Sequence, residues 1–294
     1  MFELISLTPS CAYIQSPAKI GVVKLSEDRV VFIDSGNDKD AGRKLRQHLD
    51  ANHWKLEAIY CTHSNADHIG GCQYLQKQTG CRIYAPGVER DFTAHTLLEP
   101  SFLYGGYPFR ELRNKFLMAQ SVDCLELGDD VLPEGLESFP LPGHFFDQVG
   151  YRSDEGVVFL ADCLSSRETL DKYRIGFIYD VAAYLETLEK VKTMEAKLFV
   201  PSHAEVTEDI APLAQYNIDV CMEIGERILQ LCHEPINSEE LLRRLFKHYG
   251  LTMNIQQHVL VGSTVRSYLA WLKDKGELEF IFEDEMLMWM RRRN

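Results

Sequence analysis

The chain has 294 residues, 45% of them hydrophobic and 26% charged, which is the composition of a globular protein with a sizeable core. Its 31 Lys and Arg against 44 Asp and Glu leave a net charge of −13, which opposes nonspecific binding to nucleic acid or to an acidic membrane. No apolar stretch approaches the roughly 20 residues that span a bilayer, and the N-terminus lacks the basic start and apolar run of a secretory signal, so we expect a cytoplasmic protein without a membrane partner.

The first two hundred residues alternate between strand-like and helix-like segments. Leu45 and Leu49 lie four apart in a helical pattern, whereas the strand candidates are short apolar runs closed by turn residues. The strand candidates are residues 19–26, 29–36, 56–63, 81–86, 137–144, 156–163 and 196–203. The helix candidates are residues 39–53, 69–80 and 180–195. This alternation predicts an α/β domain, which we place at residues 1–215.

Residues 91–120 interrupt this alternation. The segment carries six aromatic side chains: Phe92, Phe102, Tyr104, Tyr107, Phe109 and Phe116. It is too aromatic for a disordered linker. Two interpretations stay open: a lid or contact surface beside a site, or an insertion that packs on its own domain.

The pattern changes near residue 216, where we place the start of a second domain, residues 216–294. Three helix candidates lie at residues 217–234, 237–250 and 255–276, and two strands within residues 277–292 turn at 283–285. Three helices followed by a β-hairpin form the outline of a winged helix. Residues 222–294 hold ten Lys and Arg and eleven Asp and Glu, a net of −1, which argues against a nucleic-acid partner. A homodimer contact, or a wall of a small-molecule substrate pocket, fits this domain better.

Metal-capable side chains stand at the ends of four strand candidates. The set is His63, Asp67, His68, His144, Asp162 and His203. Sites in layered α/β proteins collect at the carboxyl ends of strands, so side chains far apart in sequence converge there. Imidazole and carboxylate groups suit zinc, iron or manganese, and a ligand set without cysteine favours a catalytic over a structural site. A bound metal lowers the pKa of its water to about 7, which makes hydroxide available at neutral pH.

These residues stand in motifs that resemble those of the metallo-β-lactamase-fold hydrolase superfamily, over roughly residues 1–210. The motifs are "FIDSG" at 32–36, "HSNADH" at 63–68, "PGH" at 142–144, "LAD" at 160–162 and "PSH" at 201–203. The resemblance implies an α/β fold, a four-layer αββα sandwich, followed here by the C-terminal helical, winged-helix-like domain.

The resemblance also implies the arrangement of the site and its chemistry. One metal position would be faced by His63, His144 and Asp162, and the other by Asp67, His68, Asp162 and His203. Asp67 would orient or deprotonate the attacking water. We therefore expect a metal-dependent hydrolase that uses metal-bound hydroxide on an ester, thioester, lactone, amide or phosphoester, with one or two zinc ions, or iron or manganese, as the cofactor.

Asn65 departs from the family motif, which has a histidine at this place. An amide oxygen is a weaker zinc ligand than imidazole, so the first metal position keeps only two nitrogens and one carboxylate. Three outcomes stay open: a hydrolase that is mono- or dinuclear by condition, a mononuclear iron enzyme similar to the superfamily's persulfide dioxygenases, and a non-catalytic site in a nucleic-acid-binding regulator. Asn65 could also serve only to shape its loop through hydrogen bonds to nearby backbone.

Overall fold

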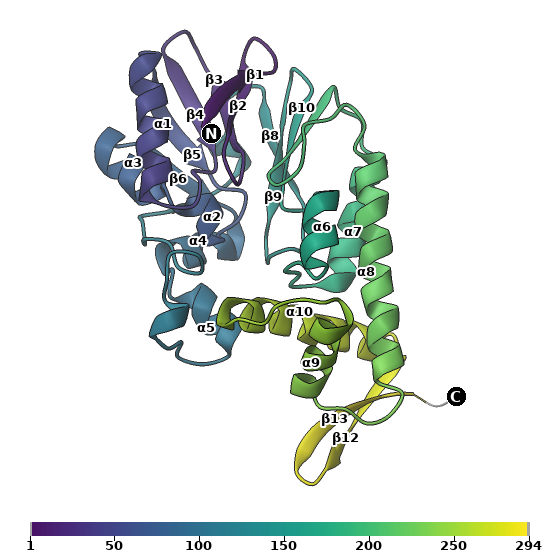
Figure 1. The fold of residues 1–294 in the computed structure, drawn as a ribbon. Coiled ribbons are helices and arrows are strands. Elements are labelled where there is room, and N and C mark those ends of the chain that lie inside the picture. Colours follow the sequence, from purple (N-terminus) through teal and green to yellow (C-terminus); the bar gives the residue numbers. More distant parts are fainter. Residues whose placement is uncertain (1, 293–294) are drawn as a thin grey trace. The chain divides into compact units, whose positions relative to one another are not determined.

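The computed structural model describes residues 2–292 (Figure 1). Contacts divide the chain into two compact units. The first holds residues 2–141, 146–164 and 195–209, and the second holds residues 142–145, 165–194 and 210–292. The sequence-based domain boundary between residues 215 and 216 stays a prediction. Residue 1, and residues 293 and 294 of the predicted second domain, lie outside the described residues.

Two β-sheets make up the framework of the first unit. The larger has seven strands in sequential order: β1 (Glu3–Ser6), β2 (Cys11–Gln15), β3 (Ile20–Lys24), β4 (Arg29–Ile33), β5 (Lys55–Tyr60), β6 (Arg82–Ala85) and β7 (Leu125–Glu126). The smaller has the order β11 (Leu198–Pro201), β10 (Val157–Ala161), β9 (Val149–Ser153) and β8 (Leu136–Pro140). Strands β4 to β7 are parallel, and so are β10 and β11, so neighbouring strands deliver their carboxyl ends to one edge.

Alternating side chains of the larger sheet divide between two cores. Phe32 of β4 belongs to a core that also contains Leu45 of helix α1 (Lys39–Ala51), and Figure 1 shows α1 and α3 (Cys72–Thr79) alongside that sheet. Its neighbour Val31 belongs to the other core, with Tyr151 and Phe159 of the smaller sheet. The first unit is therefore layered as helix, sheet and sheet. The second helical layer of the predicted sandwich stays a prediction, because α6 (Arg167–Tyr173) and α7 (Val181–Lys192) belong to the second unit.

All the predicted strands and helices of the first two hundred residues are confirmed, but the pattern does not predict β1, β2, β7 or β9. Strand β2 is buried at four successive positions, so it shows no alternation of apolar and polar residues. Strand β9 contains Gly150, a residue depleted in strands. Glycine is needed there because a Cβ would lie 2.6 Å from the ring of Phe139 on the neighbouring strand.

The 91–120 segment is folded on the first unit. It contains parts of helix α4 (Gly87–Ala94), helix α5 (Leu98–Tyr104) and a short 3₁₀ helix, η1 (Arg110–Leu112). The rings of Phe92 and Phe102 each lie 5.3 Å from the ring of Phe146, which supports packing of the insertion on its own unit. Tyr107 and Phe116 stay exposed, at 71% and 65%, so part of the segment offers a surface.

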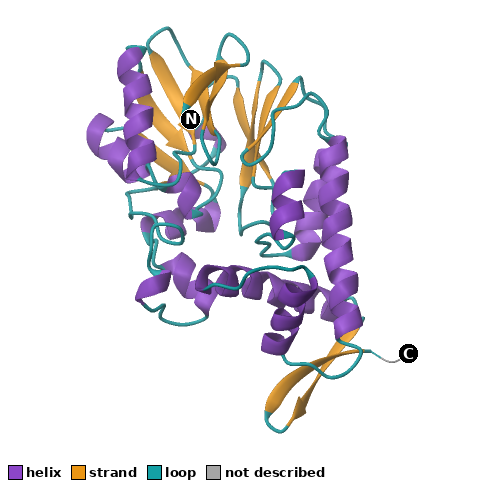
Figure 2. Ribbon diagram, in the orientation of Figure 1, coloured by secondary structure: helices purple, strands orange, loops and turns teal. Residues whose placement is uncertain are grey.

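The second unit is mainly helical (Figure 2). Beside α6 and α7 it contains α8 (Ala211–Leu231), α9 (Ser238–His248), α10 (Ile255–Asp274) and a hairpin of β12 (Leu278–Glu283) and β13 (Met286–Arg291). Asn237 caps α9 by accepting a hydrogen bond from the Glu240 N–H. Helix α8 begins six residues before the predicted start, with Pro212 in its first turn. Among residues 2–292, no helix combines the length and apolar character needed to cross a bilayer.

Candidate metal centre

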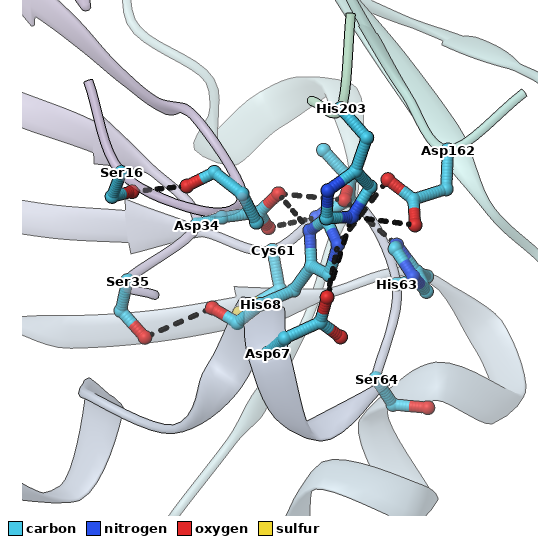
Figure 3. A network of polar contacts seen from close by, with 12 residues as sticks. Ser16, Asp34, Ser35, Cys61, His63, Ser64, Asp67, His68, Asp162 and His203 are labelled. Atoms are coloured by element: carbon cyan, nitrogen blue, oxygen red, sulfur yellow. Dashed lines mark hydrogen bonds and ion pairs between the residues drawn. The ribbon is translucent and has the colours of Figure 1, made fainter. Parts of the chain in front are cut away.

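Strand ends of both sheets bring together four predicted ligands within the first unit (Figure 3). Asp67 and His68 lie on the short helix α2 (Ala66–Ile69), which follows β5, while Asp162 directly follows β10 and His203 lies two residues after β11. One ligand atom from each residue lies within 4.8 Å of the others. The four residues come from three distant segments of the chain, so the fold, and not local sequence, creates this group.

Two imidazoles and two carboxylates face one another in this group. His203 Nε2 lies 3.3 Å from Asp67 Oδ2 and 3.2 Å from Asp162 Oδ2. His68 Nε2 lies 3.3 Å from Asp162 Oδ1 and 3.7 Å from Asp67 Oδ2. Asp162 therefore bridges the two histidines with its two oxygens. Its side chain is 11% exposed, whereas that of Asp67 is 41% exposed, so Asp67 is the carboxylate of the pair that meets solvent.

Asp34 fixes the tautomer of His68. The Nδ1 of this fully buried imidazole lies 2.8 Å from Asp34 Oδ2, and a carboxylate oxygen can only accept, so Nδ1 carries a proton. Its Nε2 is buried and has no hydrogen-bond partner among the described residues, although two carboxylates face it. A lone pair directed at carboxylate oxygens is unfavourable unless a cation lies between them. The donor set therefore fits a divalent metal ion.

His203 is held in the same tautomer by backbone. Its Nδ1 lies 2.9 Å from the carbonyl oxygen of Pro17, which can only accept, so Nδ1 donates and Nε2 faces the carboxylates. Pro17 lies between β2 and β3, and the Lys19 N–H donates to the Ser202 carbonyl at 3.0 Å, so the two sheets are tied at this point.

A relay from Asp34 also reaches His63. The Thr62 hydroxyl donates to Asp34 Oδ2 at 2.8 Å, so its oxygen accepts from His63 Nδ1 at 2.9 Å. The Thr62 N–H donates to Asp34 Oδ1 at 2.8 Å, which completes the contacts of this carboxylate. Asp34 is 1% exposed and has a φ of +65°, a left-handed conformation that Asp and Asn tolerate better than most residues. Asp34 thus orients two predicted ligands.

The first metal position predicted from the sequence takes residues from both units, since His63 and Asp162 belong to the first unit and His144 to the second. This position stays a prediction. His144 stands in the 142–145 segment that clusters with the second unit, where its Nδ1 donates to the Phe177 carbonyl at 3.1 Å. In all four histidines, therefore, Nδ1 donates to an oxygen and Nε2 is left for a ligand.

The charges of the group shift the pKa of every member toward ion pairing. Burial alone would raise the pKa of Asp67 and Asp162, but the neighbouring histidines outweigh it and lower both, that of Asp162 well below its usual value. Burial alone would lower the pKa of His68 and His203, but the same carboxylates raise that of His68 well above 6.5 and that of His203 to about 10. Without a metal, protons on the imidazoles supply the positive charge that these carboxylates require.

Asn65 is engaged by a carboxyl group of the insertion. Its Nδ2 donates to Glu99 Oε1 on helix α5 at 2.8 Å, and Glu99 is 5% exposed. Burial raises the pKa of Glu99 well above 4.5, so a neutral carboxyl faces the amide. The backbone carbonyl of Asn65 accepts from the His68 N–H at 2.9 Å as α2 begins, but the Asn65 side chain makes no capping hydrogen bond to that helix. Asn65 therefore connects the metal-binding loop to the 91–120 segment.

Three supporting residues were missed as site residues from the sequence. Only Asp34 had a signal, because it ends a strand in the "FIDSG" motif. Glu89 and Glu99 have none, since both lie in helices that the pattern did not predict. Glu89 is fully buried and accepts from the Ser64 N–H and hydroxyl at 3.0 and 2.5 Å, and from the Asp147 N–H at 2.9 Å. It thereby fixes the residue that follows His63.

Two glycines let the metal-binding loop cross the end of β4. A Cβ on Gly70 would lie 2.3 Å from the carbonyl carbon of Asn37, and one on Gly71 would lie 2.4 Å from the Ser35 carbonyl oxygen. The close approach allows the Ser35 N–H and hydroxyl to donate to the His68 carbonyl at 2.7 and 2.9 Å. The backbone of His68 is thus held from one side while Asp34 holds its ring.

Comparison with known families agrees with this geometry. Residues 15–203, more than half of the chain, match the family model described as the metallo-beta-lactamase superfamily. The chain belongs to this superfamily. The metallo-beta-lactamase match begins at the end of β2 and ends at His203, so it spans every predicted ligand.

Curated relatives of this metallo-beta-lactamase superfamily chain match it over different lengths. A hydroxyacylglutathione hydrolase of Nitrobacter winogradskyi is 35% identical over 130 residues, which are 44% of this chain and 42% of the relative. The chain thus spans less than half the length of this curated relative. A Drosophila melanogaster beta-lactamase-like protein 2 homolog is 23% identical over 239 residues, 76% of this chain and 72% of that protein.

Solved structures show the same fold. A metallo-beta-lactamase family protein of Thermus thermophilus has a TM-score of 0.74 at 18% identity and covers 98% of this chain and 100% of its own. A beta-lactamase domain protein of Burkholderia ambifaria has a TM-score of 0.73 at 16% identity, and the match covers 99% of this chain and 94% of that protein. The predicted fold class is confirmed as an α/β metallo-beta-lactamase fold with C-terminal helices. The predicted enzyme class, a hydrolase of this superfamily, agrees with the matches.

Proposed function

We propose that this metallo-beta-lactamase superfamily chain is a metal-dependent hydrolase. The observation that carries the proposal is the group of Asp67, His68, Asp162 and His203, whose four ligand atoms all lie within 4.8 Å of one another. The mononuclear iron alternative considered from the sequence would use only His63, His144 and Asp162 as ligands. The group of four residues is not needed for that alternative, so its presence favours hydrolysis. Zinc is the first candidate for the metal, because two imidazoles and carboxylates without cysteine are its usual catalytic ligands.

A bound divalent cation would lower the pKa of a water molecule bound to it and would polarise the scissile carbonyl or phosphoryl group. The chain's own residues have separate tasks. Asp67 is the most exposed member of the group, and its depressed pKa keeps it ionised at neutral pH, so we assign it the orientation of the attacking water and acceptance of its proton. Asp34 and the Pro17 carbonyl keep the Nε2 atoms of His68 and His203 directed at the reacting centre.

Asn65 leads us to propose unequal metal positions. The four-residue position would fill tightly, whereas the position of His63, His144 and Asp162 would fill more weakly, because the amide of Asn65 is turned to Glu99. We expect the protein to carry one ion when metal is scarce and two when metal is abundant.

Among esters, thioesters, lactones, amides and phosphoesters, we place S-acyl thioesters first. Support comes from the hydroxyacylglutathione hydrolase of Nitrobacter winogradskyi, which is 35% identical over 130 residues. That match covers 44% of this chain and 42% of the relative, so the acyl group and the thiol are open to test. For the second unit we keep the winged-helix-like outline as a proposal and assign it no nucleic-acid partner, given the charge of −1 over residues 222–294.

Elemental analysis joined to a hydrolysis panel tests the proposal. Protein purified without added metal should contain about one zinc per chain. It should release thiol from acyl thioesters faster than acid from simple esters. His203→Ala should lose most of the metal and the activity, whereas His233→Ala, which removes a histidine whose side chain is 80% exposed, should keep both. A single iron in the purified protein, or unchanged hydrolysis by His203→Ala, would overturn the assignment.

A further inference from the structure

A cavity of about 660 Å³ lies where the 91–120 segment meets helix α3. This volume falls within the range of small-molecule sites in proteins, which is roughly 300–1,000 Å³. All of its lining residues belong to the first unit, and none of them is a predicted metal ligand. The cavity is therefore a candidate binding site that is separate from the metal centre.

One part of the cavity wall is apolar, and another part is polar and held in place. Leu97 and Leu98 are 40% and 41% exposed, and both line the cavity together with Met118. On the polar part, Gln73 Nε2 donates to the Ser121 carbonyl at 2.8 Å, which ties helix α3 to the end of the insertion. An apolar wall with a few fixed polar groups is the usual composition of a pocket for a small organic molecule.

The cavity carries a positive charge in an acidic protein. Its lining includes Arg113 but no Asp or Glu, although the chain has 44 Asp and Glu against 31 Lys and Arg. Arg113 Nη1 donates to the Tyr107 hydroxyl at 3.0 Å, and the guanidinium lies 5.4 Å from the centroid of that ring. Within residues 2–292, this guanidinium forms no ion pair with a carboxylate. Its planar N–H groups can therefore pair with a carboxylate supplied by a ligand.

Helix α5 contributes one face to the cavity and another to the loop that carries Asp67. Leu98 and Ser101 are three residues apart, so they lie on one face of the helix, and both line the cavity. Glu99 lies between them in sequence, is 5% exposed and accepts from Asn65 Nδ2 at 2.8 Å. A ligand in the cavity meets a different face of α5 from the one that meets the metal-binding loop, so its binding does not require a metal ion.

We propose that this cavity binds a small organic anion that carries a carboxylate on an apolar body. Arg113 pairs with the carboxylate, while Leu97, Leu98 and Met118 contact the apolar body. A cation would be repelled by the guanidinium and would meet no carboxylate in the lining. A neutral molecule would leave the charge of Arg113 uncompensated. An organic anion is the ligand that the apolar wall and the charge favour together.

Isothermal titration calorimetry of the full chain tests the proposal, with phenylbutyrate as the probe and its neutral amide, phenylbutyramide, as the control ligand. The wild type should bind about one phenylbutyrate per chain, at least about tenfold more tightly than the amide. Arg113→Gln should weaken phenylbutyrate binding at least about tenfold and should change the affinity for the amide by less than about threefold. Arg110→Gln is the matched control, because it removes the same charge from an exposed side chain outside the lining, and it should keep the wild-type affinity.

A carboxylate placed in the wall gives a second test. Leu98→Asp should weaken phenylbutyrate binding at least about tenfold, and circular dichroism should be unchanged because Asp suits the first turn of a helix. The proposal would be overturned if the wild type showed no saturable binding of phenylbutyrate, or equal affinity for the acid and the amide. Equal losses in Arg110→Gln and Arg113→Gln, or wild-type affinity in Leu98→Asp, would also overturn it.

Removing metal with a chelator separates this proposal from the proposed hydrolase activity. No lining residue is a predicted metal ligand, so the affinity for phenylbutyrate should stay within about twofold of its value before chelation. Loss of phenylbutyrate binding in the metal-free protein would place the carboxylate at the metal centre and would overturn the assignment to this cavity.

Discussion

Replacing Asp34 by Asn changes one atom of the support beneath the metal ligands and leaves the rest of the site in place. We expect this variant to bind zinc ten- to hundredfold more weakly than wild type, about 1.4–2.7 kcal/mol. Asn tolerates the left-handed backbone of this position as well as Asp does, so the substitution adds no strain at φ +65°.

The magnitude follows from the hydrogen bonds of the carboxylate. Oδ1 accepts from the Thr62 N–H, and Oδ2 accepts from both His68 Nδ1 and the Thr62 hydroxyl. If the amide oxygen keeps the bond to the Thr62 N–H, the amide nitrogen must donate toward His68 Nδ1. That moves the proton of His68 to Nε2, the atom that faces the metal, and a protonated nitrogen cannot bind it. If the amide flips, a buried N–H of Thr62 is left without an acceptor.

Competition with a chromophoric chelator measures the zinc dissociation constant, and urea unfolding of the metal-free protein reports any general damage. Asp38→Asn is the control, because it converts another carboxylate that caps helix α1 through the N–H groups of Asp40 and Ala41, at 2.9 and 3.0 Å. If Asp34→Asn bound zinc within about threefold of wild type, the direction of the imidazole nitrogens would not depend on this carboxylate, and the reasoning would fail.

Three further predictions concern the same unit. Asn65→His adds an imidazole to the weaker metal position, so the metal content under excess zinc should approach two ions per chain. Titration calorimetry should show the second ion binding at least about tenfold more tightly than in wild type. Asn65→Ala removes the bond to Glu99 without adding a ligand and should show no such gain. Removing metal with a chelator should lower Tm by about 5–10 °C, since a ligand at 100 times its Kd contributes about 2.7 kcal/mol, and an unchanged calorimetric scan would contradict a metal bound to the folded state. Burial raises the pKa of Glu89 to about 7 from its ordinary 4.5, so the folded protein favours the neutral carboxyl group. The free energy of unfolding should therefore fall by up to about 3 kcal/mol as the pH rises from about 4.5 to about 7, and should then level off. Glu89→Gln should flatten this segment of the urea-unfolding profile, and an identical slope in the variant would exclude Glu89 as its source.

Two kinds of feature can be predicted from the sequence of this protein: helices and strands with a regular apolar pattern, and polar residues that directly follow a strand. The apolar runs before His63, Asp162 and His203 identified their strands, and the polar residues after them identified the ligands that the structure brings together. The ligand set could be proposed because parallel strands place their carboxyl ends at one edge of a sheet. The alternation of strand and helix along the sequence already implies such parallel strands.

Other parts could not be predicted because their physical cause lies in tertiary contacts. Glu99 is held in the interior by burial and by the amide of Asn65, and nothing in its own helix distinguishes it from a surface glutamate. The role of Asp34 depends on a left-handed turn that places its carboxylate under His68. Strand β2 lies within the sheet and is buried on both faces, so it lacks the alternation that marks an amphipathic strand.

Gly70 and Gly71 limit how this protein can vary. Because even a methyl group at either position would overlap backbone atoms at 2.3–2.4 Å, a library that randomises both positions should return glycine alone among clones that retain metal. Changes in selectivity during evolution or engineering must then enter through other segments. The 91–120 insertion is the nearest candidate, since it carries exposed side chains such as Tyr107 and reaches the loop through Glu99.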